Sequence, residues 1–284
     1  MARPVESSTS LQRTYRYLRI SIAATVVAIF VSVAVAAASV GWLTSVSDYF
    51  YTPARNVFVG SLIAVSLALF ALSGRGLERA LLDAAALFAP LIAVVPTTLA
   101  PGTIPGVGLP CQYRCFPPEF EPDAENGVIT YVIVGGVAVL VALALVALQQ
   151  SSFRSVAFSL GLAVAVLAAV GLTWLFARDA FLQQGHFVAT VAFFALFAAV
   201  AVLNAFPRGD AAPPPQAIRA WYIAIAALLA LVLVVYVALG VLGIVTRSGV
   251  PVVLLVEAAA LCLFCAFWVV QCIEKWNEGD PGIR

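Results

Sequence analysis

Eight long apolar runs dominate the chain, and short polar segments separate them. Each run lasts about 17–27 residues, without the alternation of apolar and polar positions that strands of a membrane barrel show. A helix needs about 20 apolar residues to cross the hydrocarbon core of a bilayer. The pattern therefore predicts an all-α, polytopic transmembrane bundle with helices at about 20–46, 57–73, 80–100, 128–148, 156–177, 186–206, 220–244 and 250–273.

Composition narrows the class of protein further. Of the 284 residues, 63% are hydrophobic and only 10% are charged. Soluble domains typically carry about 25% charged residues, so the lipid bilayer is the partner that this apolar surface requires. The net charge of +1 argues against a nucleic-acid partner.

The basic residues predict how the bundle is oriented. Eight helices place both termini on one side, and with that side cytoplasmic the inner segments hold all the basic residues except Arg55, Arg114, Arg178 and Arg247. The positive-inside bias thus predicts a plasma-membrane protein with both termini in the cytoplasm. Its expected parts are a cytoplasmic segment at 1–19, a membrane domain at 20–273 and a cytoplasmic tail at 274–284.

The longest polar interruption, 101–127, is expected outside the cell. It contains six prolines, four acidic residues and the pair Cys111 and Cys115. In an oxidising compartment these cysteines can form a disulfide across a short loop, but the spacing also fits two free thiols. A zinc site would need two further ligands, and the loop has no histidine.

Ionisable residues inside apolar runs are costly and therefore informative. Asp83 follows Arg79 by one helical turn, and we interpret these two as a structural ion pair near the inner surface. Pro90 and Pro96 lie farther along the same run and predict a kink.

Glu257 is the most informative of these residues. It lies about seven residues into the last run, hence roughly 10 Å below the outer surface. No basic residue stands within a turn of it, so we expect a partner on another helix. The outer half of the bundle also collects the other members of a candidate pocket, which are His186, Arg55, Asp48, Arg178 and Asp179. Arg55 and His186 are the favoured partners, and a set of structural ion pairs is the competing interpretation.

Three stretches resemble a family of uncharacterised bacterial multi-pass membrane proteins. They are SDYFYTPARNVFVG at 47–60, ERALLDAAALFAPLIAVVPT at 78–97 and AFWVVQCIEKW at 266–276. The resemblance could cover most of the chain and implies a helical membrane fold of about eight helices. It implies no activity.

Three classes of function stay open. The first, which we favour by elimination, is a non-catalytic protein that senses, scaffolds or assists envelope processes through the loop at 101–127 and the outer pocket. A lipid-like or small-molecule ligand is the partner considered for that pocket. The second is a transporter for a small or lipid-like solute, although the polar groups gather toward the outer surface rather than at midplane. The third is an intramembrane enzyme, for which the sequence offers no catalytic set, metal motif or cofactor motif. Nothing in the sequence indicates an oligomeric state.

The predicted orientation can be tested by cysteine labelling. After reduction, a membrane-impermeant maleimide should label Cys111 and Cys115 in intact cells, because 101–127 is expected outside. Mass spectrometry of the labelled peptide measures the result. Labelling that requires permeabilised cells would reverse the orientation.

Overall fold

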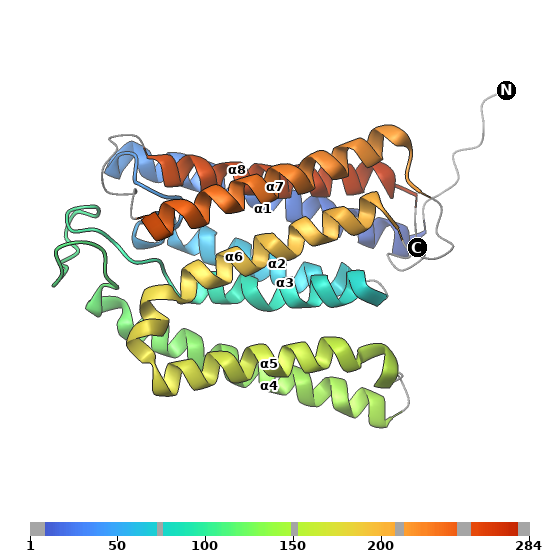
Figure 1. The fold of residues 1–284 in the computed structure, drawn as a ribbon, viewed down its shortest axis with the longest axis horizontal. Coiled ribbons are helices and arrows are strands. Elements are labelled where there is room, and N and C mark those ends of the chain that lie inside the picture. The colour runs from blue at the N-terminus through green and yellow to red at the C-terminus, as the bar shows by residue number, and fades with distance from the viewer. Residues whose placement is uncertain (1–8, 73–75, 149–152, 208–212, 243–250, 278–284) are drawn as a thin grey trace.

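The computed structural model describes residues 9–72, 76–148, 153–207, 213–242 and 251–277. These residues form eight α-helices that run roughly along one common axis (Figure 1). Their bounds are α1 Ser10–Val40, α2 Arg55–Leu72, α3 Gly76–Val94, α4 Glu121–Ala147, α5 Phe153–Phe176, α6 Arg178–Ala205, α7 Gln216–Leu242 and α8 Val252–Glu274. Two short 3₁₀ helices, η1 Ser47–Tyr51 and η2 Pro118–Phe120, lie between them. The all-α class predicted from the sequence is confirmed.

Seven of the described helices are long and apolar enough to cross a membrane. The remaining helix, α3, has 19 residues and carries Glu78, Arg79 and Asp83 near its start. At about 1.5 Å per residue it still extends roughly 28 Å, close to the thickness of a hydrocarbon core. The chain is therefore a multi-pass membrane protein.

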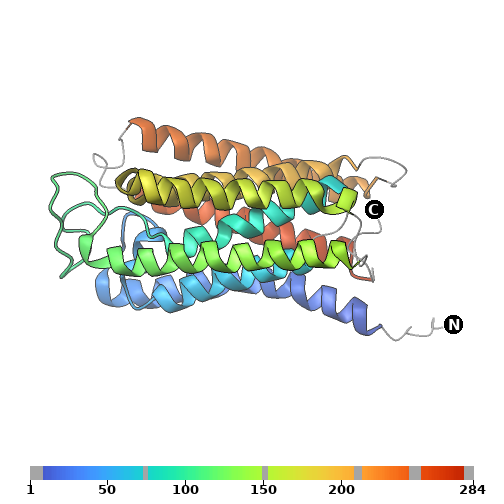
Figure 2. The same cartoon turned by 90° about the horizontal axis from the view of Figure 1, so that it is seen from below.

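The first and last helices bring both ends of the described chain to the same end of the bundle (Figure 2). The Gln12 side chain donates a hydrogen bond to the Asn277 carbonyl at 2.7 Å. The Arg16 guanidinium donates to the Trp276 carbonyl at 2.8 Å and lies 4.0 Å from the centre of the Trp276 ring. Which side of the membrane this end faces stays a prediction.

Helix α1 begins and ends earlier than its hydropathy predicts. A capping box explains the start, because the Thr9 hydroxyl accepts from the Gln12 amide and the Gln12 side chain accepts from the Thr9 amide. The helix ends at Val40, and Gly41 follows with a φ of 82° that other residues rarely adopt. The expected continuation to residue 46 is therefore wrong.

Helix α4 begins at Glu121, inside the stretch that we expected to be loop. Pro122 fixes a helical φ in the first turn, where its missing amide hydrogen costs nothing. Glu121 and Asp123 place negative charge at the positive end of the helix dipole.

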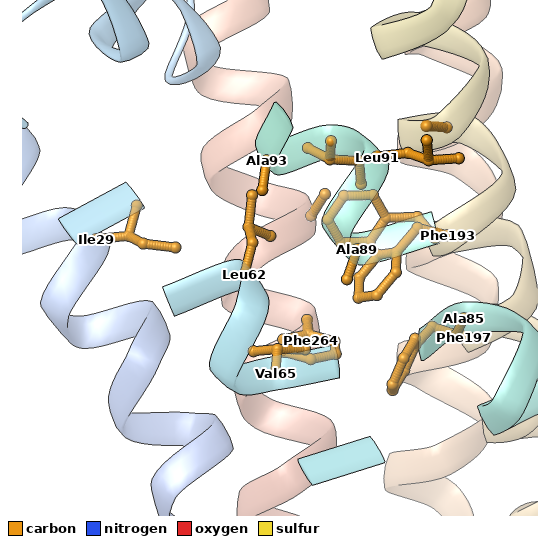
Figure 3. Packing of buried hydrophobic residues seen from close by; sticks show 14 of the residues in the cluster. Ile29, Leu62, Val65, Ala85, Ala89, Leu91, Ala93, Phe193, Phe197 and Phe264 are labelled. Carbon is orange, nitrogen blue, oxygen red and sulfur yellow. The ribbon is translucent and has the colours of Figure 1, made fainter. Parts of the chain in front are cut away.

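Helix α3 lies at the centre of the fold, in contact with α2, α4, α5 and α6. Small side chains let helix backbones approach closely, which favours packing in lipid. Its buried alanines are Ala80, Ala84, Ala85, Ala86, Ala89 and Ala93. Figure 3 shows part of this core, where α3 packs among Leu62 and Val65 of α2 and Phe193 and Phe197 of α6.

Pro90 interrupts the hydrogen bonding of α3, and α2 compensates for it. Proline has no amide hydrogen, so the carbonyl of Ala86 lacks its helical donor. The Ser66 hydroxyl donates to that carbonyl at 2.7 Å. Pro96, expected within the helix, instead follows its end at Val94.

Helices α4 and α5 form a hairpin at one side of the bundle, next to α3 (Figure 1). The Tyr131 hydroxyl donates to the Leu87 carbonyl of α3 at 3.1 Å. At Gly127 an added Cβ would lie 2.7 Å from the Cβ of Val94, so this end of the hairpin packs closely against α3. Most apolar side chains of α4 are nevertheless exposed, as expected for a surface that faces lipid.

Several sequence predictions fall outside the described residues. They concern residues 1–8, the Gly74-Arg75 break, the turn at 149–152, linker residues 208–212, the connection that contains Arg247, and the tail from residue 278.

The Ser66–Pro90 compensation predicts a double-mutant result. Ser66→Ala should lower the free energy of unfolding by about 0.5–1.5 kcal/mol, because the Ala86 carbonyl then lacks any donor. In the Pro90→Ala background the new amide should replace the hydroxyl, so Ser66→Ala should cost much less. Equal costs in both backgrounds, measured by denaturation in mixed micelles, would contradict this account.

Candidate functional site

The connection between α1 and α2, residues 41–54, is mostly buried at the bundle end opposite to both ends of the described chain, and we call it the plug. We predict that this end faces out of the cell and call it the outer end, and the opposite end the inner end. Within the plug, Ser47, Asp48, Tyr49 and Phe50 are all buried. The plug is fastened to α8, since the Leu254 amide donates to the Thr44 carbonyl at 2.9 Å. Non-helical backbone at membrane depth is tolerated only where protein or a cavity surrounds it, so the plug requires polar partners.

Both carboxyl oxygens of Glu257 of α8 contact the plug. Oε2 accepts from the Ser47 amide at 3.0 Å, and Oε1 lies 3.2 Å from the Ser47 hydroxyl. The same hydroxyl lies 2.9 Å from Nε2 of His186 on α6. The Tyr236 hydroxyl of α7 donates to Glu257 Oε1 at 3.4 Å. Glu257 and His186 are thus connected through Ser47.

Asp48 forms the second polar centre of the plug. Its side chain is fully buried, accepts from the Thr44 hydroxyl, and lies 3.4 Å from the Arg114 guanidinium. Burial raises the pKa of Asp48 above its usual value, while Arg114 and the hydroxyls of Thr44 and Ser45 oppose that rise.

Arg114 reaches Asp48 from the loop between α3 and η2, residues 95–117, which we call the outer loop. A disulfide joins Cys111 to Cys115, which is one of the alternatives that the sequence left open. Cys115 and Leu99 exchange two backbone hydrogen bonds of 2.9 and 3.0 Å. The disulfide loop is therefore attached to the segment that follows α3, and Arg114 lies within that loop.

Three side chains at the outer end bond the backbone carbonyl groups that follow α3. Val95 accepts from His186 Nδ1 at 2.8 Å, and Thr97 accepts from the Tyr51 hydroxyl at 2.6 Å. Thr98 accepts from Arg114. His186, Tyr51 and Arg114 thus each bond a backbone carbonyl that no helix satisfies.

A cavity, the core cavity, lies beneath the plug between α1, α2, α3, α6 and α8, with a volume of about 50 Å³. Its walls are almost entirely apolar and include Phe58, Phe193, Phe194 and Phe264. Ser47, Glu257 and Thr190 are polar residues that line it. Figure 3 shows part of this wall, with Ile29 of α1, Leu62 and Val65 of α2, Phe193 of α6 and Phe264 of α8.

Thr190 is an unusual residue within the wall. It is only 7% exposed, yet its Oγ1 has no hydrogen-bond partner in the described part of the chain. A buried hydroxyl without a partner is unfavourable. This atom therefore indicates where a polar group of a bound molecule would be stabilised.

The remaining members of the predicted pocket lie elsewhere at the outer end. Arg55 pairs with Asp123 of α4 at 2.8 Å, and Arg178 pairs with Glu121 and Glu125, each at 2.9 Å. The structure thus places both arginines on acids of α4 instead of on Glu257. Asp179 is exposed in the first turn of α6. At the inner end, Arg79 and Asp83 form the expected contact at 3.6 Å.

Sequence reasoning missed a second polar layer at the inner end. Asn204 donates to Glu78 at 3.1 Å and accepts from Gln271 at 2.7 Å. Arg19 and Lys275, which we assigned to the cytoplasmic segments, are 2% and 3% exposed, and Arg19 donates to the Lys275 carbonyl. The adjacent space of about 10 Å³ is about the size of one water molecule. Amides within apolar runs, such as Asn204 and Gln271, were the available signal.

Within the described ranges, no three His, Cys, Asp or Glu side chains are grouped so that they could hold a metal ion.

Comparison with models of protein families, with curated proteins and with solved structures found no match for this chain. No family is therefore identified, and the family resemblance drawn from 47–60, 78–97 and 266–276 stays a prediction.

The Asp48–Arg114 contact predicts a rescue. Arg114→Met should lower the free energy of unfolding by about 3 kcal/mol, because it leaves a buried carboxylate without its cation. Adding Asp48→Asn should restore most of that loss, since burial already disfavours the charged carboxyl.

Arg178→Met is the matched control for this rescue, because its ion pairs are exposed to solvent and should contribute much less to stability than the buried contact of Asp48. Denaturant titration of the purified protein measures all four forms. Equal losses for Arg114→Met and Arg178→Met would show that the Asp48 contact does not stabilise the plug.

Proposed function

We propose that this protein is a non-catalytic membrane protein that binds a lipid-like molecule in the core cavity. The observation that carries the proposal is the Thr190 hydroxyl, which is buried without a partner in the described chain and lines the same cavity as Ser47 and Glu257. A polar group of the bound molecule would supply the missing hydrogen bond.

The shape and lining of the cavity define the class of ligand. Walls of aliphatic and phenyl groups favour the end of an alkyl chain, because a cavity of about 50 Å³ is too small for a whole lipid tail, and polar groups at few positions orient that end. A sugar or a nucleotide would leave many polar groups unpaired against such walls. Binding without chemistry suits a protein that senses a lipid or assists processes of the cell envelope.

An aromatic layer supports a binding site rather than an open path for transport. Phe264 lines the core cavity, whereas Phe267 and Trp268 line the small space at the inner end. Phe197 packs between them, with its ring centre 4.5 Å from that of Phe264 and 5.7 Å from that of Phe267. These packed rings separate the two spaces.

The proposed orientation agrees with the disulfide. Disulfides persist in oxidising compartments, and the one between Cys111 and Cys115 lies at the bundle end opposite to the start of α1 and the end of α8. We place that end outside the cell and both termini in the cytoplasm, in agreement with the positive-inside bias.

An intramembrane hydrolase is the second candidate, and one distance favours it. Ser47 Oγ lies 2.9 Å from His186 Nε2, as in a nucleophile paired with its base. The rest of the geometry fits this role poorly. His186 Nδ1 contacts the Val95 carbonyl instead of a carboxylate, and Glu257 contacts the serine itself.

Photocrosslinking tests the binding site. In nanodiscs, a diazirine-bearing dodecanol should label peptides from the cavity wall, and excess dodecanol should compete. Leu261→Trp places an indole in the cavity and should reduce the competed labelling by about tenfold, which corresponds to roughly 1.4 kcal/mol of binding energy. Peptide mass spectrometry measures the labelling.

The matched control is Val188→Trp, which adds the same side chain to an exposed position of α6. It should leave the competed labelling unchanged. Labelling that survives Leu261→Trp, or that falls equally in both variants, would refute binding in the core cavity. A fluorophosphonate adduct on Ser47 would favour the hydrolase instead.

A further inference from the structure

The Ser47 hydroxyl connects two titratable side chains inside the bundle. It lies 2.9 Å from His186 Nε2 and 3.2 Å from Glu257 Oε1. Ser47, His186 and Glu257 are each less than one-tenth exposed. Their polar atoms therefore need hydrogen-bond partners inside the bundle.

Donor counting gives the number of protons that this trio holds when both contacts of the Ser47 hydroxyl are hydrogen bonds. The Val95 carbonyl only accepts, so His186 Nδ1 carries a hydrogen. If His186 Nε2 has no hydrogen, the Ser47 hydroxyl donates to it, and the 3.2 Å contact with Glu257 is a hydrogen bond only when the carboxyl of Glu257 is protonated and donates to Ser47. If Nε2 has a hydrogen, the hydroxyl donates to the Glu257 carboxylate. Both arrangements contain one proton more than neutral His186 and ionised Glu257, and both have zero net charge.

The charged and polar groups around the trio do not change its net charge of zero. Asp48 of η1 and Arg114 of the outer loop oppose each other's charge. Tyr236 of α7 donates a hydroxyl to Glu257, and Thr190 of α6 adds another hydroxyl to the cavity wall. Among the residues that the structure describes, no lysine or arginine lines the core cavity. The acidic proton of the trio is therefore the charge that balances Glu257.

A cation that arrived in this site would change the balance. An additional uncompensated charge in a low-dielectric interior is strongly unfavourable. If the proton leaves when the cation binds, the site stays neutral and the cation gains a carboxylate partner. The phenyl rings of Phe58, Phe193, Phe194 and Phe264 in the wall can also face a cation favourably.

We propose that the core cavity binds a primary alkylammonium ion, and that binding expels the one proton that Ser47 shares between Glu257 and His186. This inference rests on the lipid-binding function proposed above and names the class of ligand. The ammonium group has three donors, and Glu257, Ser47 and Thr190 offer acceptors for them. In the bound state the Ser47 hydroxyl donates to His186 Nε2, Glu257 is ionised, and the expelled proton goes to water. No electrons are transferred and no covalent bond of the ligand changes.

Proton release on binding tests the proposal with the unmodified protein. The probes are dodecylammonium and its neutral analogue dodecanol, added to the protein in nanodiscs at neutral pH, where an alkylammonium is charged like a lysine. Titration calorimetry in two buffers of different ionisation enthalpy counts the protons released. We expect about one proton for each bound dodecylammonium and none for dodecanol. Leu261→Trp protein measures the contribution of partition into lipid, which is subtracted.

Variants locate the proton. Glu257→Gln should still bind dodecanol in the crosslinking assay, but should release no proton with dodecylammonium and should bind it at least about tenfold more weakly. Glu121→Gln, which removes an outer carboxylate of α4, should behave like the unmodified protein. If Glu257→Gln does not fold, the two-probe comparison decides alone.

The possible failures are distinguishable. Dodecanol that labels the cavity while dodecylammonium neither binds there nor releases a proton would overturn the ammonium proposal and leave the lipid-binding function standing. Absence of competed cavity labelling with dodecanol and no saturable binding of dodecylammonium would overturn both. Proton release that persists in Leu261→Trp would assign it to the lipid surface and overturn the exchange.

Discussion

The outer end of this bundle depends on one requirement, that buried backbone outside helices must find hydrogen-bond partners within the protein. Two such segments meet there, the plug at 41–54 and the residues that follow α3. Glu257 holds the Ser47 amide, and His186 holds the Val95 carbonyl. Polar side chains within apolar helices are thus explained first by the backbone that they satisfy.

The same requirement accounts for a possible binding site. A side chain that reaches buried backbone must itself be buried, so its remaining hydrogen-bonding capacity faces the interior. Glu257 has contacts beyond the Ser47 amide, and it lines the core cavity together with the unpartnered hydroxyl of Thr190. Packed rings around Phe197 close the inner side of that cavity. The contacts that stabilise the outer end and the binding site that we propose therefore use the same few side chains.

The sequence predicted what depends on composition and missed what depends on contact. Apolar runs of membrane length predicted the fold because no other structure satisfies such a backbone in lipid. The cost of a buried carboxylate predicted a partner for Glu257 on another helix, with Arg55 or His186 favoured. The structure instead places Ser47 and Tyr236 against Glu257. His186 reaches Glu257 only through Ser47. The sequence could not predict the role of Ser47, since a serine beside a helix end carries no distinctive signal. Arg55 and Arg178 stand at similar depth to His186, but α4 begins early enough to present Asp123, Glu121 and Glu125 to them.

A cryo-EM map of the protein in a nanodisc, with and without dodecylammonium, would test the central claim most directly. Our account predicts that dodecylammonium adds density for its amino end and first methylenes within the core cavity, between Thr190 and the Ser47–Glu257 pair. It also predicts that the plug stays buried in both maps. A Glu257 side chain directed toward lipid, or a core cavity that remains empty while the probe decorates the lipid-facing surface, would contradict the account.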